Sequence, residues 1–341
     1  MPQRLRALLK VARSAGHLLV LTHNDPDPDA IASALALQYL LDQTLGLKTE
    51  LVYKGIIGRA ENQALVRYLG KPLRHVTSAD LSPGQPIALV DSQPGAGNNA
   101  LRSELGPLIV IDHHPWRQAT ATAAFFDVRA NIGSTSTMIT EYLRLADITP
   151  PPRVATGLFY GIKTDTLGLL RGASPTDVEA YFHLQSSIDV EALVEIERAQ
   201  VAAEYFQRLD AALHAARVYQ DVIISYVGPM RRPDLAAEMA DLLLRLRHMQ
   251  WAVCMGAYQG TLILAVRTRS RRLGAGRLVQ HVVDSRGTAG GHGIMAGGQV
   301  PLFDQQPQQV ADALTHRVLE FLEIPLDTAG VPLMAQKDEE D

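Results

Sequence analysis

The feature that most constrains this chain is the alternation of short apolar runs with helical segments in its first half. Residues 17–22, 51–53, 87–90 and 108–111 are predominantly apolar runs of strand length, and residues 29–41 have a helical pattern. Continuous apolar runs indicate strands that are buried on both faces, because a half-exposed strand alternates apolar and polar residues. The first half therefore predicts an α/β domain with a doubly wound parallel sheet.

Three of these runs end in polar residues. His23 follows the first run, Asp91 follows the third, and Asp112, His113 and His114 belong to the end of the fourth. Ligands of open parallel sheets bind beyond the carboxyl ends of the strands. We therefore expect three separate segments to deliver polar side chains to the same edge of the sheet.

The segment HNDPDPDA, residues 23–30, places one imidazole and three carboxylates within seven positions. Its two prolines restrict the backbone, so we expect the following helix to begin with Asp29 as its N-cap. Clustered carboxylates repel one another unless a cation neutralises them. An oxygen-rich set with one or two histidines suits Mn²⁺ or Mg²⁺ better than structural zinc. The simpler alternative is a turn capped by aspartates.

The later motifs are weaker when each is taken alone. A single Asp91 is compatible with the start of a loop, and Asp165 by itself is a poor signal. The adjacent histidines 113 and 114 point in different directions, so one can bind a metal while the other meets the substrate. Asp112 can orient an imidazole. As a further carboxylate, Asp165 would complete a two-metal site.

The composition excludes several classes of protein. Of the 341 residues, 47% are hydrophobic and 20% charged, as in ordinary soluble proteins. A single cysteine, Cys254, permits neither an intrachain disulfide nor a cysteine-based zinc cluster, and its apolar run predicts a core position. No apolar run is long enough to span a membrane, so we expect a cytoplasmic protein. The net charge of −4 argues against a nucleic-acid binder that uses its whole surface.

The second half contains two further strand-like runs, residues 221–227 and 261–266, and a helical pattern between them. A glycine-rich segment over residues 290–298 reads as a loop, and a final helix is predicted over residues 308–322. Five arginines lie within eleven positions, and they form either an anion site or a solvated edge: Arg267, Arg269, Arg271, Arg272 and Arg277. Few helix breakers occur from residue 189 to 216, which predicts a helical bridge between two domains.

These motifs, in this order, resemble the DHH phosphoesterase superfamily, named for the triplet seen here at residues 112–114. The segment GGHGIMAGG, residues 290–298, resembles the signature of the DHH-associated domain of the first type. The resemblance covers about residues 15–325, and the layout is similar to bacterial nanoRNase/pAp phosphatases and RecJ-like proteins. It implies a DHH catalytic domain over residues 1–187, a helical linker over 188–217, a smaller α/β substrate-binding domain over 218–330 and an acidic flexible tail over 331–341.

The resemblance implies a role for each matching residue. Two Mn²⁺ ions, with Mg²⁺ or Co²⁺ as substitutes, would be bound by His23, Asp27, Asp29, Asp91, His113 and Asp165. Asp91 would bridge the ions, and His114, oriented by Asp112, would face the scissile phosphate. Asp25 is expected to form the turn or to support the ligands from behind. The substrate-binding set would be Arg267, Arg269, Gly290, Gly291, His292, Gly297 and Gly298.

The expected activity is hydrolysis of phosphodiester or phosphomonoester bonds in short nucleotides: oligoribonucleotides of two to five residues, pAp, and linear or cyclic dinucleotides. Paired divalent ions can clamp both the attacking and the leaving oxygen, and His114 would stabilise the phosphoryl oxygens or protonate the leaving group. Neither long duplex DNA nor a membrane is an expected partner, and the resemblance implies a homodimer. The alternatives are a pyrophosphatase or polyphosphatase and a non-catalytic nucleotide-binding regulator.

Three departures from the usual pattern bear on the substrate. Pro28 stands where the family usually has glycine, and Met295 replaces a small residue in the glycine-rich segment. The segment LGLLR, residues 167–171, lacks the aromatic residue often found after the last metal motif. All six expected metal ligands are present, so these departures concern specificity.

Overall fold

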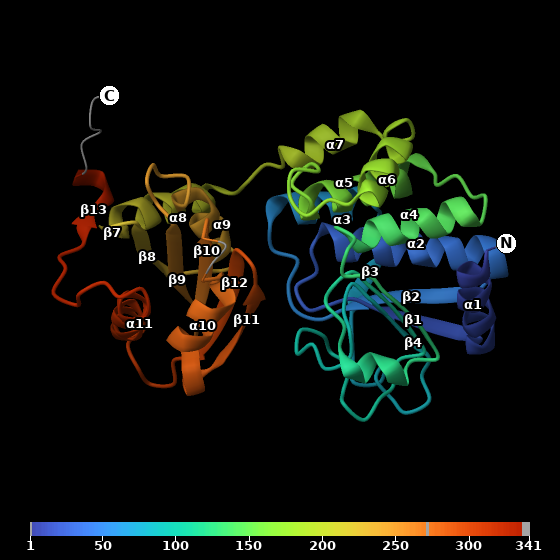
Figure 1. Cartoon of the computed structure of the whole chain (residues 1–341), viewed down its shortest axis with the longest axis horizontal. Coiled ribbons are helices and arrows are strands. Elements are labelled where there is room, and N and C mark those ends of the chain that lie inside the picture. Colours follow the sequence, from blue (N-terminus) through green and yellow to red (C-terminus); the bar gives the residue numbers. More distant parts are fainter. Residues whose placement is uncertain (1, 271–272, 336–341) are drawn as a thin grey trace. The chain divides into compact units, whose positions relative to one another are not determined.

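The computed structural model describes residues 2–270 and 273–335, and the chain divides into two compact units, Met1–Ala199 and Gln200–Asp341. Figure 1 shows that each unit contains its own sheet with helices packed against it. Parts of two predicted features lie outside the described residues. They are Arg271 and Arg272 of the arginine-rich anion site or edge, and the last six residues of the acidic tail. The two units are described separately below.

The first unit has a six-stranded parallel sheet in the order β3-β2-β1-β4-β5-β6. Its strands are β1 (His17–Leu21), β2 (Lys48–Tyr53), β3 (Leu73–His75), β4 (Ile87–Val90), β5 (Ile109–Asp112) and β6 (Phe125–Val128). Its helices are α1 (Gln3–Ala12), α2 (Pro28–Leu45), α3 (Ala60–Tyr68), α4 (Thr135–Leu145), α5 (Pro152–Asp165), α6 (Pro175–Gln185) and α7 (Val190–Glu197), with short 3-10 turns η1 (Arg13–Ala15) and η2 (Gln118–Thr122). The order reverses between β1 and β4, as in doubly wound sheets.

The two faces of this sheet are covered differently. The larger core lies under the helices, where buried side chains of α1, α2, α4 and α5 pack on the strands. The opposite face has a smaller core, in which Leu81, Leu101, Leu105 and Ala123 from connecting segments cover the strands. Figure 1 shows the helices above this sheet and mainly loops below it. The predicted parallel sheet is confirmed, but loops take the place of helices on its second face.

Helix α2 begins directly beside the carboxyl end of β1. Asp27 is its N-cap, with Oδ1 accepting a hydrogen bond from the backbone N–H of Ala30 at 3.0 Å. The expectation that Asp29 is the N-cap is therefore wrong. Pro28 occupies the first helical position, where its fixed φ is already suitable and its missing N–H costs nothing. This explains locally why a proline is tolerated at position 28.

The second unit has a seven-stranded mixed sheet in the order β11-β12-β10-β9-β8-β7-β13. The strands are β7 (Arg217–Tyr219), β8 (Val222–Pro229), β9 (Trp251–Tyr258), β10 (Thr261–Thr268), β11 (Thr288–His292), β12 (Met295–Pro301) and β13 (Val331–Pro332). The helices are α8 (Ala203–Ala215), α9 (Leu235–Leu243), α10 (Ala275–Val283) and α11 (Pro307–Phe321), with 3-10 turns η3 (Asp284–Arg286) and η4 (Leu333–Ala335). Helices α10 and α11 cover one face, and α8 and α9 cover the other.

Cys254 lies on β9 in the second of these cores and has no exposed surface. Burial raises the pKa of its thiol far above the ordinary value, so the side chain is an unreactive thiol. The sequence-based prediction of a core position is confirmed.

Three sequence-based expectations about this half need correction. The predicted bridge over residues 189–216 is two helices, α7 and α8, separated by residues 198–202, and each packs on its own unit. The predicted glycine-rich loop is a β-hairpin formed by β11 and β12. The predicted tail begins too early, because Val331 and Pro332 pair with β7 as an edge strand. The edge strand depends on pairing with a distant segment, whereas β11 and β12 pair residues that are near one another in the sequence.

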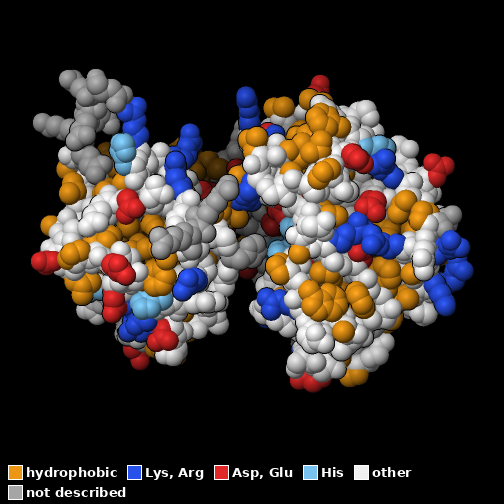
Figure 2. Space-filling model, in the orientation of Figure 1, with side chains coloured by type: hydrophobic (Ala, Val, Ile, Leu, Met, Phe, Trp, Pro, Cys, Tyr) orange, Lys and Arg blue, Asp and Glu red, His pale blue; other side chains and the backbone are white. Residues whose placement is uncertain are grey.

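The mixture of charges on the surface and the hydrophobicity of the helices agree with the average composition of the chain. Figure 2 shows Lys and Arg side chains interspersed with Asp and Glu on the visible face of each unit. Among the helices in the described part of the chain, none combines the length and hydrophobicity needed to cross a bilayer.

Candidate metal centre

The first set of candidate ligands lies where β1 and β4 end. His23 Nε2 is 3.7 Å from Asp27 Oδ1 and 3.5 Å from Asp91 Oδ2. The other ring nitrogen, Nδ1, is 2.8 Å from the carbonyl oxygen of Asn24. A backbone partner on Nδ1 directs Nε2 toward the carboxylates, which is the usual orientation of a metal-binding histidine.

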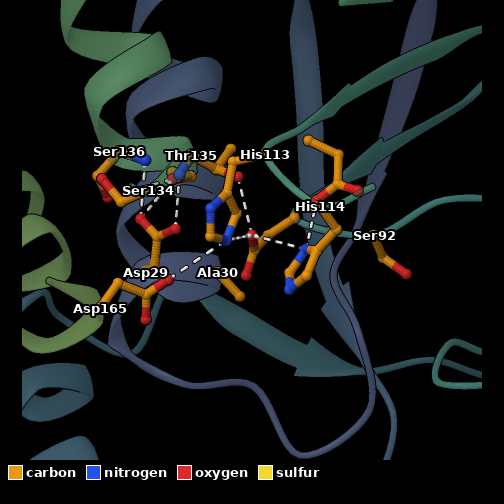
Figure 3. Close-up of polar contacts among 12 residues, drawn as sticks. Asp29, Ala30, Ser92, His113, His114, Ser134, Thr135, Ser136 and Asp165 are labelled. Carbon is orange, nitrogen blue, oxygen red and sulfur yellow. Dashed lines mark hydrogen bonds and ion pairs between the residues drawn. The ribbon is translucent and has the colours of Figure 1, made fainter. Parts of the chain in front are cut away.

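The second set lies on the other side of Asp91. His113 Nε2 is 3.5 Å from Asp91 Oδ1 and 3.3 Å from Asp165 Oδ2, at the carboxyl end of α5. Nδ1 of His113 is 3.3 Å from the carbonyl oxygen of Ile132. Figure 3 shows Asp165, His113 and His114 close together, with a dashed line marking the ion pair between His113 and Asp165.

Asp91 is the residue shared by both sets. It follows β4 with a left-handed backbone (φ 58°), and its N–H donates to the carbonyl of Ile111 on β5 at 2.9 Å. Its side chain is 2% exposed. Asp91 Oδ1 also accepts a hydrogen bond from Thr135 Oγ1 at 2.8 Å. Because left-handed aspartates are uncommon, we read this conformation as one imposed by the site.

Asp29 is fully buried, and the N-terminus of α4 holds it. Its Oδ2 accepts from the backbone N–H of Thr135 at 2.7 Å, and its Oδ1 accepts from the backbone N–H of Ser136 at 2.7 Å. Both bonds are drawn in Figure 3. The first N–H groups of a helix have no intrahelical acceptor and carry partial positive charge, so they stabilise a carboxylate there.

His114 points differently from His113. Its Nδ1–H donates to Asp112 Oδ1 at 2.8 Å, and 35% of the His114 side chain is exposed. The other oxygen of Asp112, Oδ2, accepts from Gln93 Nε2 at 2.6 Å. The hydrogen bond to Nδ1 shows that Asp112 orients the imidazole of His114, as predicted. That His114 faces the substrate stays a prediction.

The charges of these groups are strongly linked. Burial would lower the pKa of His23, but Asp27 and Asp91 outweigh it and hold the pKa well above its ordinary value. Burial would raise the pKa of Asp91, but His23, His113 and His114 outweigh it and lower the pKa. Asp91 is therefore a buried carboxylate that the surrounding imidazoles stabilise.

Asp29 and Asp165 show the opposite shift. Burial, followed by the charge of Asp91, raises the pKa of Asp29 to about 7. Burial, followed by the charges of Asp27, Asp29 and Asp91, raises the pKa of Asp165 well above its ordinary value. Mutually repelling buried carboxylates of this kind are the expected state of a cation site that holds protons in place of its cation.

The donor set fits divalent cations. Three overlapping groups bring their ligand atoms within 4.8 Å of one another: Asp91, His113 and His114; His23, Asp27 and Asp91; and Asp29, His113 and Asp165. His113 Nε2 is buried and has no hydrogen-bond partner among the described residues. An imidazole nitrogen in this state beside two carboxylates fits the role of a cation ligand. Carboxylate-rich sets with imidazole suit Mn²⁺ or Mg²⁺.

Asp25 does not join these groups. Its backbone is left-handed (φ 54°), and its Oδ1 accepts from the backbone N–H of Ile56 at 2.7 Å. A Cβ at Gly55 (φ 88°) would lie 2.2 Å from the same oxygen, so this position requires glycine. Asp25 therefore forms the turn, as expected.

The predicted substrate-binding glycines belong to the β11–β12 hairpin of the second unit. Gly290 pairs with Gly297, both are exposed, and a Cβ at Gly290 would meet no atom within 4 Å. Gly298 points to the other face, where a Cβ would lie 2.6 Å from Val283 on α10. Gly291 (φ 133°) is required by close contact with Ala296. Gly290 and Gly297 thus leave a bare patch of backbone, whereas Gly298 allows α10 to pack.

The remaining predicted residues of the second unit differ from one another. Arg267 is 11% exposed and donates to Asp241 and to the carbonyl of Val266, which compete with a phosphate for its guanidinium. Arg269 is exposed and donates to the carbonyl of Leu244 at 3.0 Å. His292 lies on β11, and its side chain is outside the described part of the structure. Substrate binding by these residues stays a prediction.

Thr135, Ser136 and Gln93 are site residues that sequence reasoning missed. Gln93 donates to Asp112, and its Oε1 accepts from Arg117 N and Thr120 Oγ1, both at 2.9 Å. The only local signal for the first two was the helix start at Ser134, which caps α4 through Thr137 N. Thr135 contacts Asp29 and Asp91, which lie 106 and 44 positions earlier in the sequence. Local sequence patterns do not reveal contacts over such separations.

The fold and the site together define an α/β protein with a divalent-cation centre at the carboxyl edge of a parallel sheet. A family model described as the DHH family, N-terminal domain, matches residues 17–162, and a DHHA1 domain model matches residues 220–323. The chain belongs to the DHH phosphoesterase superfamily, with an N-terminal DHH domain and a C-terminal DHHA1 domain. The resemblance inferred from the motifs is confirmed.

Curated relatives match parts of their own length. An uncharacterized protein of Methanocaldococcus jannaschii is 36% identical over 317 residues, which cover 90% of this chain and 64% of that protein. A probable manganese-dependent inorganic pyrophosphatase of Streptococcus pyogenes is 31% identical over 180 residues, which cover 52% of this chain and 55% of that protein. The chain therefore spans less than two thirds of either relative.

Solved structures share the fold. A crystal structure of an exopolyphosphatase-related protein from Bacteroides fragilis has a TM-score of 0.74 at 16% identity, with 93% of this chain and 96% of that chain covered. RecJ in complex with Mn²⁺ from Thermus thermophilus has a TM-score of 0.50 at 17% identity, with 95% of this chain and 56% of that chain covered.

Replacing Asp91 by alanine should abolish metal binding, because both sets of candidate ligands share this carboxylate. We expect Mn²⁺ to raise the melting temperature of the wild-type protein and to leave that of Asp91→Ala unchanged. Asp25→Asn is the matched control, since asparagine tolerates the left-handed backbone and still accepts from Ile56. A wild-type-sized Mn²⁺ shift in Asp91→Ala would show that the cation lies elsewhere.

Metal affinity should fall as the pH falls. The pKa of Asp29 is raised to about 7 and the pKa of His23 is raised above its ordinary value, so both groups bind protons that a cation must displace. Below pH 7 we expect the apparent Kd for Mn²⁺ to rise roughly tenfold or more per pH unit. Calorimetry at pH 8, 7 and 6, in buffers of different ionisation enthalpy, measures both Kd and the protons released. A Kd independent of pH would contradict this picture.

Proposed function

We propose that this protein is a Mn²⁺-dependent phosphoesterase with two divalent ions that hydrolyses phosphodiester or phosphomonoester bonds of short nucleotides. The observation that carries the proposal is the convergence of two sets of candidate ligands on the shared carboxylate of Asp91, next to the oriented ring of His114. One set consists of His23, Asp27 and Asp91, and the other joins Asp91 to His113 and Asp165. A shared carboxylate between two sets is what a two-metal site requires.

When bound, the cations would activate the attacking water and neutralise charge on the phosphoryl oxygens. The contribution of the chain itself is to place groups around that phosphate. Burial would lower the pKa of His114, but Asp112 and Asp91 outweigh it and raise the pKa to about 9. The imidazole of His114 then donates a hydrogen bond to a phosphoryl oxygen or to the leaving oxygen.

The second unit supports a short substrate. Along β12 the exposed side chains alternate with buried ones, and the exposed face carries the bare backbone of Gly290 and Gly297 at the edge of the sheet. Without a Cβ, this surface allows a phosphate or a base to approach the backbone closely. A few fixed groups of this kind recognise two to five nucleotides, whereas a long strand needs a continuous basic and aromatic groove.

A pyrophosphatase activity is the second candidate. It is favoured by the match to a probable manganese-dependent inorganic pyrophosphatase over 180 residues. That match leaves about half of this chain unaccounted for, and the chain carries a DHHA1 domain with an exposed glycine hairpin. Pyrophosphate has no base or ribose for such a surface to contact. The complete set of candidate ligands argues against a non-catalytic regulator.

A hydrolysis panel in Mn²⁺ tests the proposal: pApA, a five-nucleotide RNA, pAp, cyclic di-AMP, pyrophosphate and a long single strand, with Asp91→Ala as the inactive control. We expect turnover confined to the short nucleotides, because the site combines a phosphate-sized metal centre with a limited binding surface. Turnover of pyrophosphate alone would replace the proposal with the second candidate. Turnover of the long strand would show that the binding surface extends further than we infer.

His114→Ala should separate catalysis from metal binding. Asp112 holds Nδ1 of His114, and we propose that the ring acts on the substrate and not on the cations. We expect kcat to fall roughly 10²- to 10⁴-fold, with the Mn²⁺-induced rise in melting temperature retained. His183→Ala, which removes an exposed histidine on α6, is the control and should keep the wild-type kcat. Loss of the Mn²⁺ effect in His114→Ala would make this residue a ligand instead.

A further inference from the structure

A turn over residues 166–172 follows Asp165 at the end of α5 and presents two leucines to solvent. Leu167 is 54% exposed and Leu170 is 89% exposed. The backbone is left-handed at three successive residues: Leu167 (φ 49°), Gly168 (φ 65°) and Leu169 (φ 71°). Leucine adopts this conformation rarely, because its Cβ is crowded there. Such a run persists only where the surroundings hold it, and it is typical of functional sites.

Several hydrogen bonds hold the turn in place. The N–H of Gly168 donates to the carbonyl of Lys163 at 2.7 Å, and the N–H of Leu169 donates to Thr166 Oγ1 at 3.0 Å. Thr166 is fully buried and donates to the carbonyl of Ile162 at 2.6 Å. The turn is thus a defined structure whose shape depends on the same helix that carries Asp165.

Arg171 closes the turn onto the candidate metal ligand. Its backbone N–H donates to the carbonyl of Thr166 at 2.8 Å, and its Nη2 donates to the carbonyl of Asp165 at 2.9 Å. Leu169 packs against the hydrophobic core of the first unit, so the leucine that follows it faces outward. The result is a fixed apolar surface on one side of Asp165, with a guanidinium beside it.

We propose that Leu167 and Leu170 pack against the nucleobase or ribose of the substrate whose phosphate is bound at the candidate metal centre. This inference rests on the proposed function and names the contact that selects nucleotides. Asp165 Oδ2 is 3.3 Å from His113 Nε2, and Leu167 lies two positions after Asp165 in the chain. A ligand with an anionic group at that point and an apolar ring next to it matches both surfaces.

The same contact discriminates against the smaller phosphate compounds. Pyrophosphate and polyphosphate would bind the metal centre equally well, but they have no apolar surface to cover the leucines. Burying one leucine side chain against a ring changes specificity by roughly tenfold. The turn therefore supplies part of the selectivity that the metal ligands, which contact only phosphate, do not supply.

The test compares pApA with the same dinucleotide lacking its bases, using the wild type, Leu170→Ser and Leu170→Met. We expect Leu170→Ser to lower the ratio of kcat/KM for the two substrates roughly tenfold, mainly by raising KM for pApA. Leu170→Met keeps the apolar surface and should hold the ratio within about twofold of wild type. Leu326→Ser, which replaces another exposed leucine, is the control and should leave the ratio unchanged.

Three results would overturn the inference: an unchanged ratio in Leu170→Ser, an equal loss on both substrates, or a change of oligomeric state in that variant by light scattering. An equal loss would assign the turn to positioning Asp165, and a changed mass would assign the leucines to contact with a second copy. Failure of the proposed function is separate, because the wild type itself would then not hydrolyse pApA.

Discussion

The buried carboxylate of Asp91 is the interaction on which the rest of the site depends. Removing a carboxylate from water costs several kcal/mol unless charges and hydrogen bonds replace its hydration. Here the replacement comes from His23 and His113, both 3.5 Å away, and from the hydroxyl of Thr135. These groups belong to three segments that are far apart in the sequence. The site is therefore stable only when these segments are correctly placed relative to one another.

Rigid elements surround this carboxylate. The N-terminus of α4 holds both oxygens of Asp29, and Gln93 holds the far oxygen of Asp112, whose other oxygen orients His114. Three of the candidate ligands, His23, His113 and Asp29, thus have backbone partners that fix their orientation. The pKa values of Asp29 and Asp165 are raised because buried carboxylates in this site repel one another. A divalent cation would balance these negative charges.

The names of similar proteins differ. One relative is a probable manganese-dependent inorganic pyrophosphatase, and RecJ shares the fold. A fold does not determine a substrate, so selectivity has to come from surfaces outside the metal set. In this chain two such surfaces are visible: the bare hairpin of β11 and β12, and the leucine turn that follows Asp165. Both coincide with places where the sequence departs from the usual family pattern, at Met295 and over residues 167–171.

The sequence by itself determined the parallel sheet, because apolar runs form buried strands and polar residues after parallel strands meet at one edge. The resemblance of its motifs to the DHH superfamily gave the family and implied the six candidate ligands. Only the tertiary structure decided that Asp27 caps α2, that Thr135 and Ser136 hold Asp29, that the glycines form a hairpin, and that loops cover one face of the first sheet. The reason is that the contacts of Asp29 and the loop cover join segments that are distant in the sequence. The hairpin and the cap at Asp27 are local, but the glycine-rich pattern and the two nearby aspartates leave them undecided.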